Sequence, residues 1–170
     1  MKQARDLITL MLGPPRRTLA VAESVTCGRL QARVGRISGA SGFFLGGITA
    51  YSLDQKSRQL GVDRAAAQAV NGVSSAVAVQ MASGVCLLFG ADIGVATTGY
   101  AEPSVLPAVA EPFAWWAIAC RETGGGFTVR SDLIDAPGLS RIDAQERFAE
   151  AAEAALIAWL AATATGAARS

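Results

Sequence analysis

Ser24 is the residue whose surroundings best suit nucleophilic chemistry. It follows an apolar run over 18–22 that predicts a buried strand, and a turn of small residues, Val25-Thr26-Cys27-Gly28, comes next. We expect a helix over about 27–35. Unpaired backbone N–H groups near 26–28 could then hold an oxyanion beside the Ser24 hydroxyl. The alternative is that Ser24 only caps this helix.

The base for such a serine cannot be histidine, because the chain contains none. This absence excludes Ser-His-Asp and Cys-His catalysis as well as histidine-based zinc sites. Lys56 is the favoured base, and Tyr51, five residues earlier at a predicted strand end, could relay a proton or orient the amine. The lysine can act only if its surroundings lower its pKa from about 10.4 toward neutrality. Otherwise it is a surface lysine beside a tyrosine at the rim of the sheet.

Three neighbouring features offer further chemistry. Cys27 is a rival nucleophile at a helix N-terminus, or else a small buried cysteine. Glu23 could bind substrate, fix Lys56 or accept hydrogen bonds from local amides. The run Thr97-Thr98-Gly99-Tyr100 has the composition of an anion-binding strand end. The three cysteines are widely spaced and odd in number, which argues against a disulfide framework and a metal site and favours a reducing cytoplasm.

The composition bounds the remaining possibilities. The chain has 170 residues, 51% of them hydrophobic, so we expect one domain over 1–170. Its formal net charge is +1 without a long run of either sign, so neither nucleic acid nor an anionic membrane is an expected partner. The start of the chain predicts a helix over 3–12 instead of a signal peptide, and polar residues interrupt the apolar window over 76–98, so no transmembrane segment is expected.

The elements expected from periodicity and capping residues alternate between strands and helices. Strands are predicted over 18–22, 43–51, 92–98, 113–120 and 127–134, and helices over 3–12, 27–35, 52–60, 74–89 and 142–162. The pattern predicts an α/β fold whose mixed, mostly parallel sheet of about five strands has helices on both faces. Its strand ends would bring Ser24, Tyr51, Thr98 and Gly99 to one rim. The glycine run 124–126 predicts a hairpin, Trp115 and Trp116 should pack on opposite faces, and the alanine-rich last helix favours a homo-oligomer.

These residues resemble the C-terminal domain of the CinA (competence/damage-inducible) family, which includes nicotinamide mononucleotide deamidase. The similar segments are 22–28 (Ala-Glu-Ser-Val-Thr-Cys-Gly), 39–47, 50–56 (Ala-Tyr-Ser-Leu-Asp-Gln-Lys), 60–62, 73–74, 81–82, 90–95 and 98–99. The resemblance implies a three-layer α/β/α sandwich. It also implies hydrolysis of the nicotinamide mononucleotide carboxamide to nicotinic acid mononucleotide and ammonia, without metal or cofactor. In this resemblance Ser24 is the nucleophile, Lys56 the general base and Tyr51 a supporting residue.

The substrate contacts expected from the motifs and from this resemblance are Glu23, Thr26, Cys27, Gly28, Gly46, Gly47, Thr98, Gly99, Tyr100 and either Arg141 or Arg147. The chain departs from the family pattern at several positions. Cys27 stands where the family has glycine, Tyr100 where it has isoleucine and Glu102 where it has glycine, and residues 111–116 replace the family's Pro-Val-Gly-Thr-Val segment. The carboxylate of Glu102 would repel a phosphate.

The leading hypothesis is an amidohydrolase for a small nucleotide. Neutral Lys56 accepts the Ser24 proton, the alkoxide attacks a carboxamide, and ammonia leaves an acyl-enzyme that water opens. The alternatives are a nucleotide-binding or regulatory module that has lost the reaction, an amidase for a different small amide, and an enzyme with Cys27 as nucleophile.

Overall fold

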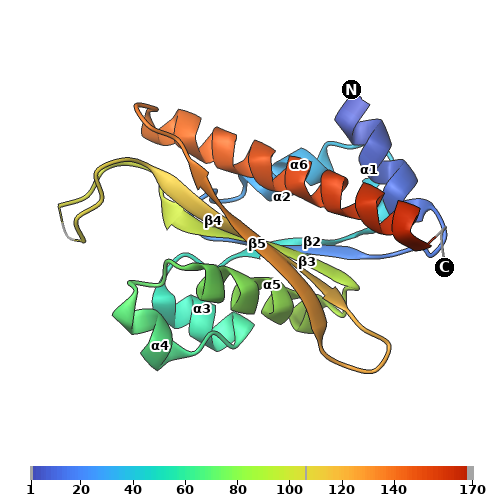
Figure 1. The fold of residues 1–170 in the computed structure, drawn as a ribbon, viewed down its shortest axis with the longest axis horizontal. Helices are drawn as coiled ribbons and strands as arrows, with labels where there is room; N and C mark the ends of the chain where they lie inside the picture. Colours follow the sequence, from blue (N-terminus) through green and yellow to red (C-terminus); the bar gives the residue numbers. More distant parts are fainter. Residues whose placement is uncertain (1, 106, 168–170) are drawn as a thin grey trace.

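The computed structural model describes residues 2–105 and 107–167 as one sheet covered by helices (Figure 1). In chain order the elements are α1 (Lys2–Leu12), β1 (Leu19–Glu23), α2 (Arg29–Gly35), the 3-10 turn η1 (Ala40–Gly42), β2 (Phe44–Thr49), α3 (Leu53–Leu60), α4 (Arg64–Ala69), α5 (Ser75–Phe89), β3 (Ile93–Tyr100), β4 (Phe113–Arg121), β5 (Phe127–Asp135) and α6 (Arg141–Ala167).

The five strands form one mixed sheet in the order β2-β1-β3-β4-β5. β1 pairs in parallel with both β2 and β3, whereas β3–β4 and β4–β5 are antiparallel. α1, α2 and α6 cover one face, and α3, α4 and α5 cover the other (Figure 1). This arrangement confirms the expected three-layer α/β/α sandwich.

Each face of the sheet has its own core. Along β1, Leu19 and Val21 belong to the cluster beneath α6, and Ala20 and Ala22 belong to the cluster beneath α5. A strand buried on both faces reads as a continuous apolar run, which is why this strand could be recognised in the sequence. The α5 layer lies very close to the sheet, since a Cβ at Gly94 would lie 2.0 Å from the Ala82 carbonyl oxygen.

Local signals placed most helix ends correctly. The Ser52 and Ser74 hydroxyls cap α3 and α5 by accepting from backbone N–H groups, and Gly61 and Gly90 end these helices with positive φ. The tryptophans of β4 join opposite cores, as expected. Two details differ: α4 was not foreseen, although Asp63 caps it, and α2 begins two residues later than expected because residues 25–28 form a turn.

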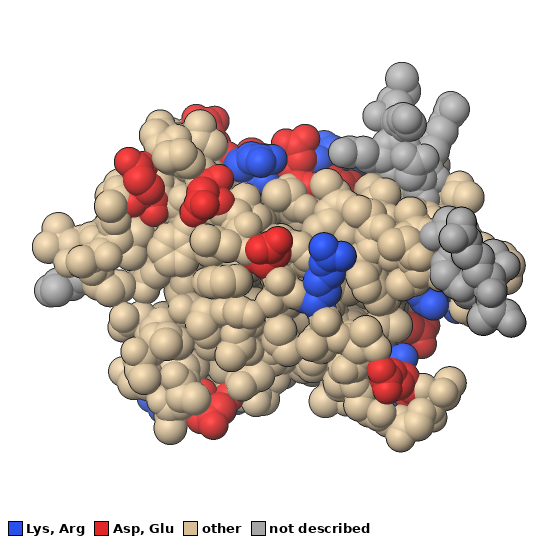
Figure 2. Space-filling model, viewed as in Figure 1, with Lys and Arg blue, Asp and Glu red and all other residues tan. Residues whose placement is uncertain are grey.

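The surface carries charges of both signs. On the face drawn in Figure 2, acidic and basic side chains are interspersed and neither sign covers a large area. Within the described part of the chain, none of the helices combines the length and apolar character needed to cross a membrane.

Candidate functional site

A cavity of about 280 Å³ opens at the carboxyl ends of β1 and β3. It therefore confirms that these strand ends meet the residues after β2 at one rim, as parallel pairing requires. Its lining comprises Ser24, Val25, Tyr51, Lys56, Asn71, Val73, Gly99, Tyr100, Ala101, Glu102, Pro103, Ser104 and Arg141.

Ser24 continues the sheet one residue beyond β1. Its backbone N–H donates to the Thr97 carbonyl at 3.0 Å, which extends the ladder between β1 and β3. Side chains alternate across a strand, so Ser24 shares a face with Ala22, on the side that carries α3 and α5. Among the described residues, the buried hydroxyl has one long contact, 3.4 Å to the Tyr51 carbonyl oxygen. Ser24 therefore has no strong hydrogen bond to break before it can turn toward a ligand.

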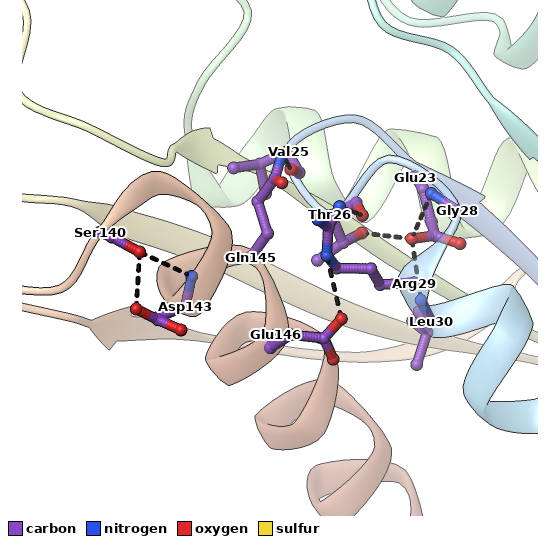
Figure 3. A network of polar contacts seen from close by, with 10 residues as sticks. All are labelled: Glu23, Val25, Thr26, Gly28, Arg29, Leu30, Ser140, Asp143, Gln145 and Glu146. Carbon is purple, nitrogen blue, oxygen red and sulfur yellow. Dashed lines mark hydrogen bonds and ion pairs between the residues drawn. The ribbon is translucent and has the colours of Figure 1, made fainter.

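Glu23 holds the turn that presents Ser24 (Figure 3). Its fully buried carboxylate accepts hydrogen bonds from Thr26 Oγ1 at 2.5 Å and from three backbone N–H groups, those of Gly28 (3.0 Å), Leu30 (3.0 Å) and Gln31 (2.8 Å). The carboxylate thus satisfies the free N–H groups at the start of α2. Of the roles considered for Glu23, bonding to local amides is the one confirmed.

Ser24 does not cap α2, so that interpretation is wrong. The residue before the helix is Gly28, which has no side-chain cap, and the N–H groups of the first turn are bound by Glu23 instead. The same contact removes the Gly28 N–H from the expected oxyanion site, because this N–H points to the carboxylate. The oxyanion role of the Thr26 and Cys27 N–H groups stays a prediction.

Two adjacent threonines of β3 reach opposite faces. Thr97 Oγ1 lies 2.7 Å from Thr26 Oγ1, and Thr26 already donates its proton to Glu23, so Thr97 is the donor in this pair. Thr98 points to the other face, where its Oγ1 contacts Lys56 Nζ. Adjacent threonines of β3 therefore contact both the turn after β1, through Thr97, and Lys56 on α3, through Thr98.

Lys56 is a buried amine with neutral partners. Its side chain is 3% exposed, and Nζ donates to the Gly72 carbonyl at 2.8 Å and to Thr98 Oγ1 at 2.9 Å. Thr98 in turn donates to the same Gly72 carbonyl at 2.8 Å. Burial lowers the pKa of Lys56 from 10.5 to about 8. The surface-lysine interpretation is therefore wrong, and roughly half of the amine is neutral near pH 8.

The contacts of Lys56 leave one position on its nitrogen. A neutral amine has two N–H donors and one lone pair. Gly72 and Thr98 take both donors, so the lone pair is directed away from these oxygens. Gly72 approaches closely because it has a φ of +70° and no side chain: a Cβ there would lie 3.3 Å from Nζ.

Tyr51, Glu102 and Arg141 surround the mouth of the cavity. Arg141 Nη2 donates to the Tyr51 hydroxyl at 3.0 Å, and Nη1 forms an ion pair with Glu102. The bond to Tyr51, followed by the nearby Glu102 charge, raises the pKa of Arg141 above its usual range. The Tyr51 side chain is 57% exposed, as expected of a residue at the rim. Tyr100 packs on Phe113 with ring centroids 5.6 Å apart, and burial raises its pKa.

Several expected substrate contacts do not line this cavity. Glu23 ends β1, Thr26 and Gly28 lie in the turn after Ser24, and Thr98 lies behind Lys56, so none of the four lines the cavity. Cys27 is exposed, which makes the buried-cysteine interpretation wrong, and it too lies outside the lining. Gly46 and Gly47 lie within β2, facing Phe89 and Gln31, and Arg147 is exposed on α6. Of the two arginines, only Arg141 borders the cavity.

Sequence reasoning missed the carbonyl partner of Lys56. Asn71 and Gly72 form a turn before α5 with positive φ at both, but nothing local in the sequence links this turn to the lysine. Glu102 was weighed only for its charge, and its pairing with Arg141 was not foreseen. Within the described residues, no group of three His, Cys, Asp or Glu side chains could hold a metal ion.

A family model described as the CinA C-terminal domain matches residues 1–160. The chain belongs to the CinA family. A CinA-like protein of Chlorobium limicola is 40% identical over 149 residues, which cover 86% of this chain and 34% of that protein. A CinA-like protein of Salinibacter ruber is 47% identical over 87 residues, covering 51% of this chain and 21% of that protein. This CinA chain thus spans between about a fifth and a third of these two relatives.

Solved CinA structures have the same fold. The competence damage-inducible protein A of Klebsiella pneumoniae superposes with a TM-score of 0.81 at 27% identity, covering 94% of this chain and 96% of that one. The competence/damage inducible protein CihA of Agrobacterium tumefaciens gives a TM-score of 0.74 at 27% identity, with coverages of 92% and 93%.

Proposed function

We propose that this chain is a metal-independent amidohydrolase in which Ser24 is the nucleophile and Lys56 its general base. One observation carries the proposal: a buried lysine with a pKa of about 8 lines the same cavity as a buried serine hydroxyl at a strand end. A base works best when its pKa lies near the working pH, and burial without a carboxylate partner provides that here.

The reaction proceeds in two steps. Neutral Lys56 takes the Ser24 proton while Oγ attacks the carboxamide carbon, and the Lys56 ammonium then gives a proton to the departing nitrogen, which leaves as ammonia. Water adds to the resulting ester with Lys56 again as base, which releases the carboxylic acid and restores the serine. Gly72 and Thr98 keep the amine oriented through both steps because they accept its other two N–H groups.

Nicotinamide mononucleotide is the substrate that the CinA resemblance implies, and it is the first compound to assay. The cavity has the size of a small-ligand site, and the rings of Tyr51 and Tyr100 at its border suit a flat heteroaromatic amide. In this proposal Gly99, Tyr100 and Arg141 contact substrate, while Glu23, Thr26, Gly28 and Thr98 position the reacting groups. The roles expected of Cys27, Gly46, Gly47 and Arg147 have no support from the cavity lining.

Location and assembly remain proposals. Three free cysteines suit a reducing cytoplasm. The homo-oligomer expected from the alanine-rich α6 stays a prediction.

The test is ammonia release from nicotinamide mononucleotide by wild type, Ser24→Ala and Lys56→Met in the presence of a chelator. We expect each substitution to lower kcat by about 10³-fold or more. Removing one member of a catalytic unit costs about as much activity as removing all of its members. Ser38→Ala and Arg58→Met are the matched controls, since both residues are exposed and outside the cavity. Equal rates in all five proteins would contradict the mechanism, and loss of wild-type activity on adding the chelator would contradict metal independence.

A binding or regulatory module is the second candidate, and three contacts favour it. The Ser24 hydroxyl contacts the Tyr51 carbonyl at 3.4 Å, and Lys56 donates to Gly72 and Thr98, so the hydroxyl and the amine are each bound to other partners. Calorimetry separates the two candidates: wild-type protein that binds nicotinamide mononucleotide without releasing ammonia is a binding module.

A further inference from the structure

Side chains from three separate segments meet at the mouth of the cavity. Tyr51 follows β2, Glu102 follows β3, and Arg141 is the first residue of α6. Arg141 bonds to both of the others, through Nη1 to the Glu102 carboxylate and through Nη2 to the Tyr51 hydroxyl. The guanidinium thus lies between the charged Glu102 carboxylate and the Tyr51 hydroxyl.

At the mouth of the cavity the charges of Arg141 and Glu102 cancel. Among the described lining residues the ionisable side chains are Tyr51, Lys56, Tyr100, Glu102 and Arg141. Burial disfavours the charged forms of Tyr100 and Lys56, and the Lys56 amine is buried whereas the Arg141 guanidinium is exposed at the mouth. Arg141 is therefore the permanent cation of the site, and Glu102 compensates it. An incoming anionic group finds no free positive charge at the mouth.

We propose that Glu102 determines the charge specificity of this site by holding Arg141, so that the site favours amides whose far end carries no phosphate or carboxylate. An anionic ligand has to displace the Glu102 carboxylate from the guanidinium, whereas a neutral or cationic ligand does not. The inference rests on the proposed function, which places the amide of the ligand at Ser24 and Lys56. It concerns only the opposite end of the ligand, which lies at the mouth of the cavity.

The ion pair is arranged so that a ligand can compete with it. The Arg141 and Glu102 side chains are 44% and 57% exposed, and exposed pairs are weak and screened by salt. Removing the Glu102 charge leaves the Tyr51 contact in place, so the guanidinium stays at the mouth and becomes available. Glu102→Gln should therefore create an anion site out of residues that are already positioned.

The experiment measures the ratio of two dissociation constants. Calorimetry on Ser24→Ala protein, with and without Glu102→Gln, gives Kd for nicotinamide mononucleotide and for the same nucleoside without its phosphate. We expect Glu102→Gln to shift the ratio toward the phosphorylated ligand by about tenfold at low salt, with a smaller shift at high ionic strength. Adding Arg141→Gln should abolish the gain.

The matched control is Glu111→Gln, which removes an exposed carboxylate between β3 and β4 that lies outside the cavity lining. The inference is overturned if the ratio does not move in Glu102→Gln, if it moves equally in Glu111→Gln, or if neither ligand binds any of the proteins. Turnover separates this inference from the proposed function. A shifted ratio with no ammonia release by wild type from either ligand supports the charge specificity and contradicts the enzyme, and an unshifted ratio with Ser24-dependent ammonia release from either ligand does the reverse.

Discussion

Replacing Glu23 with Gln should destabilise the protein although it changes one atom. In the native site one carboxylate oxygen, Oε2, accepts from Thr26 Oγ1 and from the Gly28 and Leu30 N–H groups, while Oε1 accepts from Gln31 N–H. A glutamine can put its carbonyl oxygen at the Oε2 position only by turning its NH₂ group toward the Gln31 N–H. Two donors then face each other in a fully buried site.

The size of the effect follows from these contacts. A hydrogen bond to a charged group contributes about 1.5–3 kcal/mol, and a buried donor left without a partner costs about 1–3 kcal/mol. Glu23→Gln loses one such bond and weakens the other three by removing the charge. Because losses within one network are not additive, we expect the free energy of unfolding to fall by about 2–4 kcal/mol.

Urea unfolding followed by circular dichroism measures this change. The matched control is Glu146→Gln on α6, whose side chain is 54% exposed and lies 3.0 Å from Arg29 Nε without the alignment of a hydrogen bond (Figure 3). The control should change stability by no more than about 1 kcal/mol. If Glu23→Gln costs no more than the control at an unchanged m-value, the carboxylate does not hold the turn that presents Ser24.

Two further outcomes follow from the surroundings of Lys56. Its pKa is about 8 in the folded protein against 10.5 for a free lysine. The unfolded chain therefore binds more protons between these pH values. The free energy of unfolding of wild type relative to Lys56→Met should rise by up to about 3 kcal/mol as the pH increases through this window. Urea unfolding that gives the same wild-type minus Lys56→Met difference at pH 7 and at pH 10.5 would contradict this. Gly72→Ala should lower kcat/KM for ammonia release at least tenfold more than Gly61→Ala, because both glycines have a φ near +70° but only the Cβ at Gly72 would contact Lys56 Nζ; equal losses would mean that backbone strain alone is responsible.

The parts of the site that local chemistry determines could be predicted from the sequence. An apolar run ending in Ser24, a capping Ser52 before Lys56 and a hydroxyl-glycine strand end at Thr98 each have a local signature. Parallel strands bring such ends to one rim, which gave the correct location of the cavity.

The parts that depend on contacts distant in sequence could not be predicted. Nothing near Lys56 indicates that its nitrogen meets a carbonyl 16 residues later and a hydroxyl 42 residues later. The choice between Ser24 and Glu23 as the cap of α2 depended on the path of a four-residue turn, and both side chains suited the role. Arg141 could be preferred to Arg147 only once the start of α6 was placed beside Glu102.

The pKa of the Lys56 amine is the most direct test of the proposed mechanism. The chain contains two lysines, Lys2 and Lys56, so protein carrying ¹³C at the lysine ε-carbon gives two signals, and Lys56→Met identifies the one that matters. The buried amine should titrate with a pKa of about 8. A Lys56 signal that titrates near 10.5 would leave only about one amine in three thousand neutral at pH 7, against about one in ten for a pKa of 8, and would contradict Lys56 as the base for Ser24.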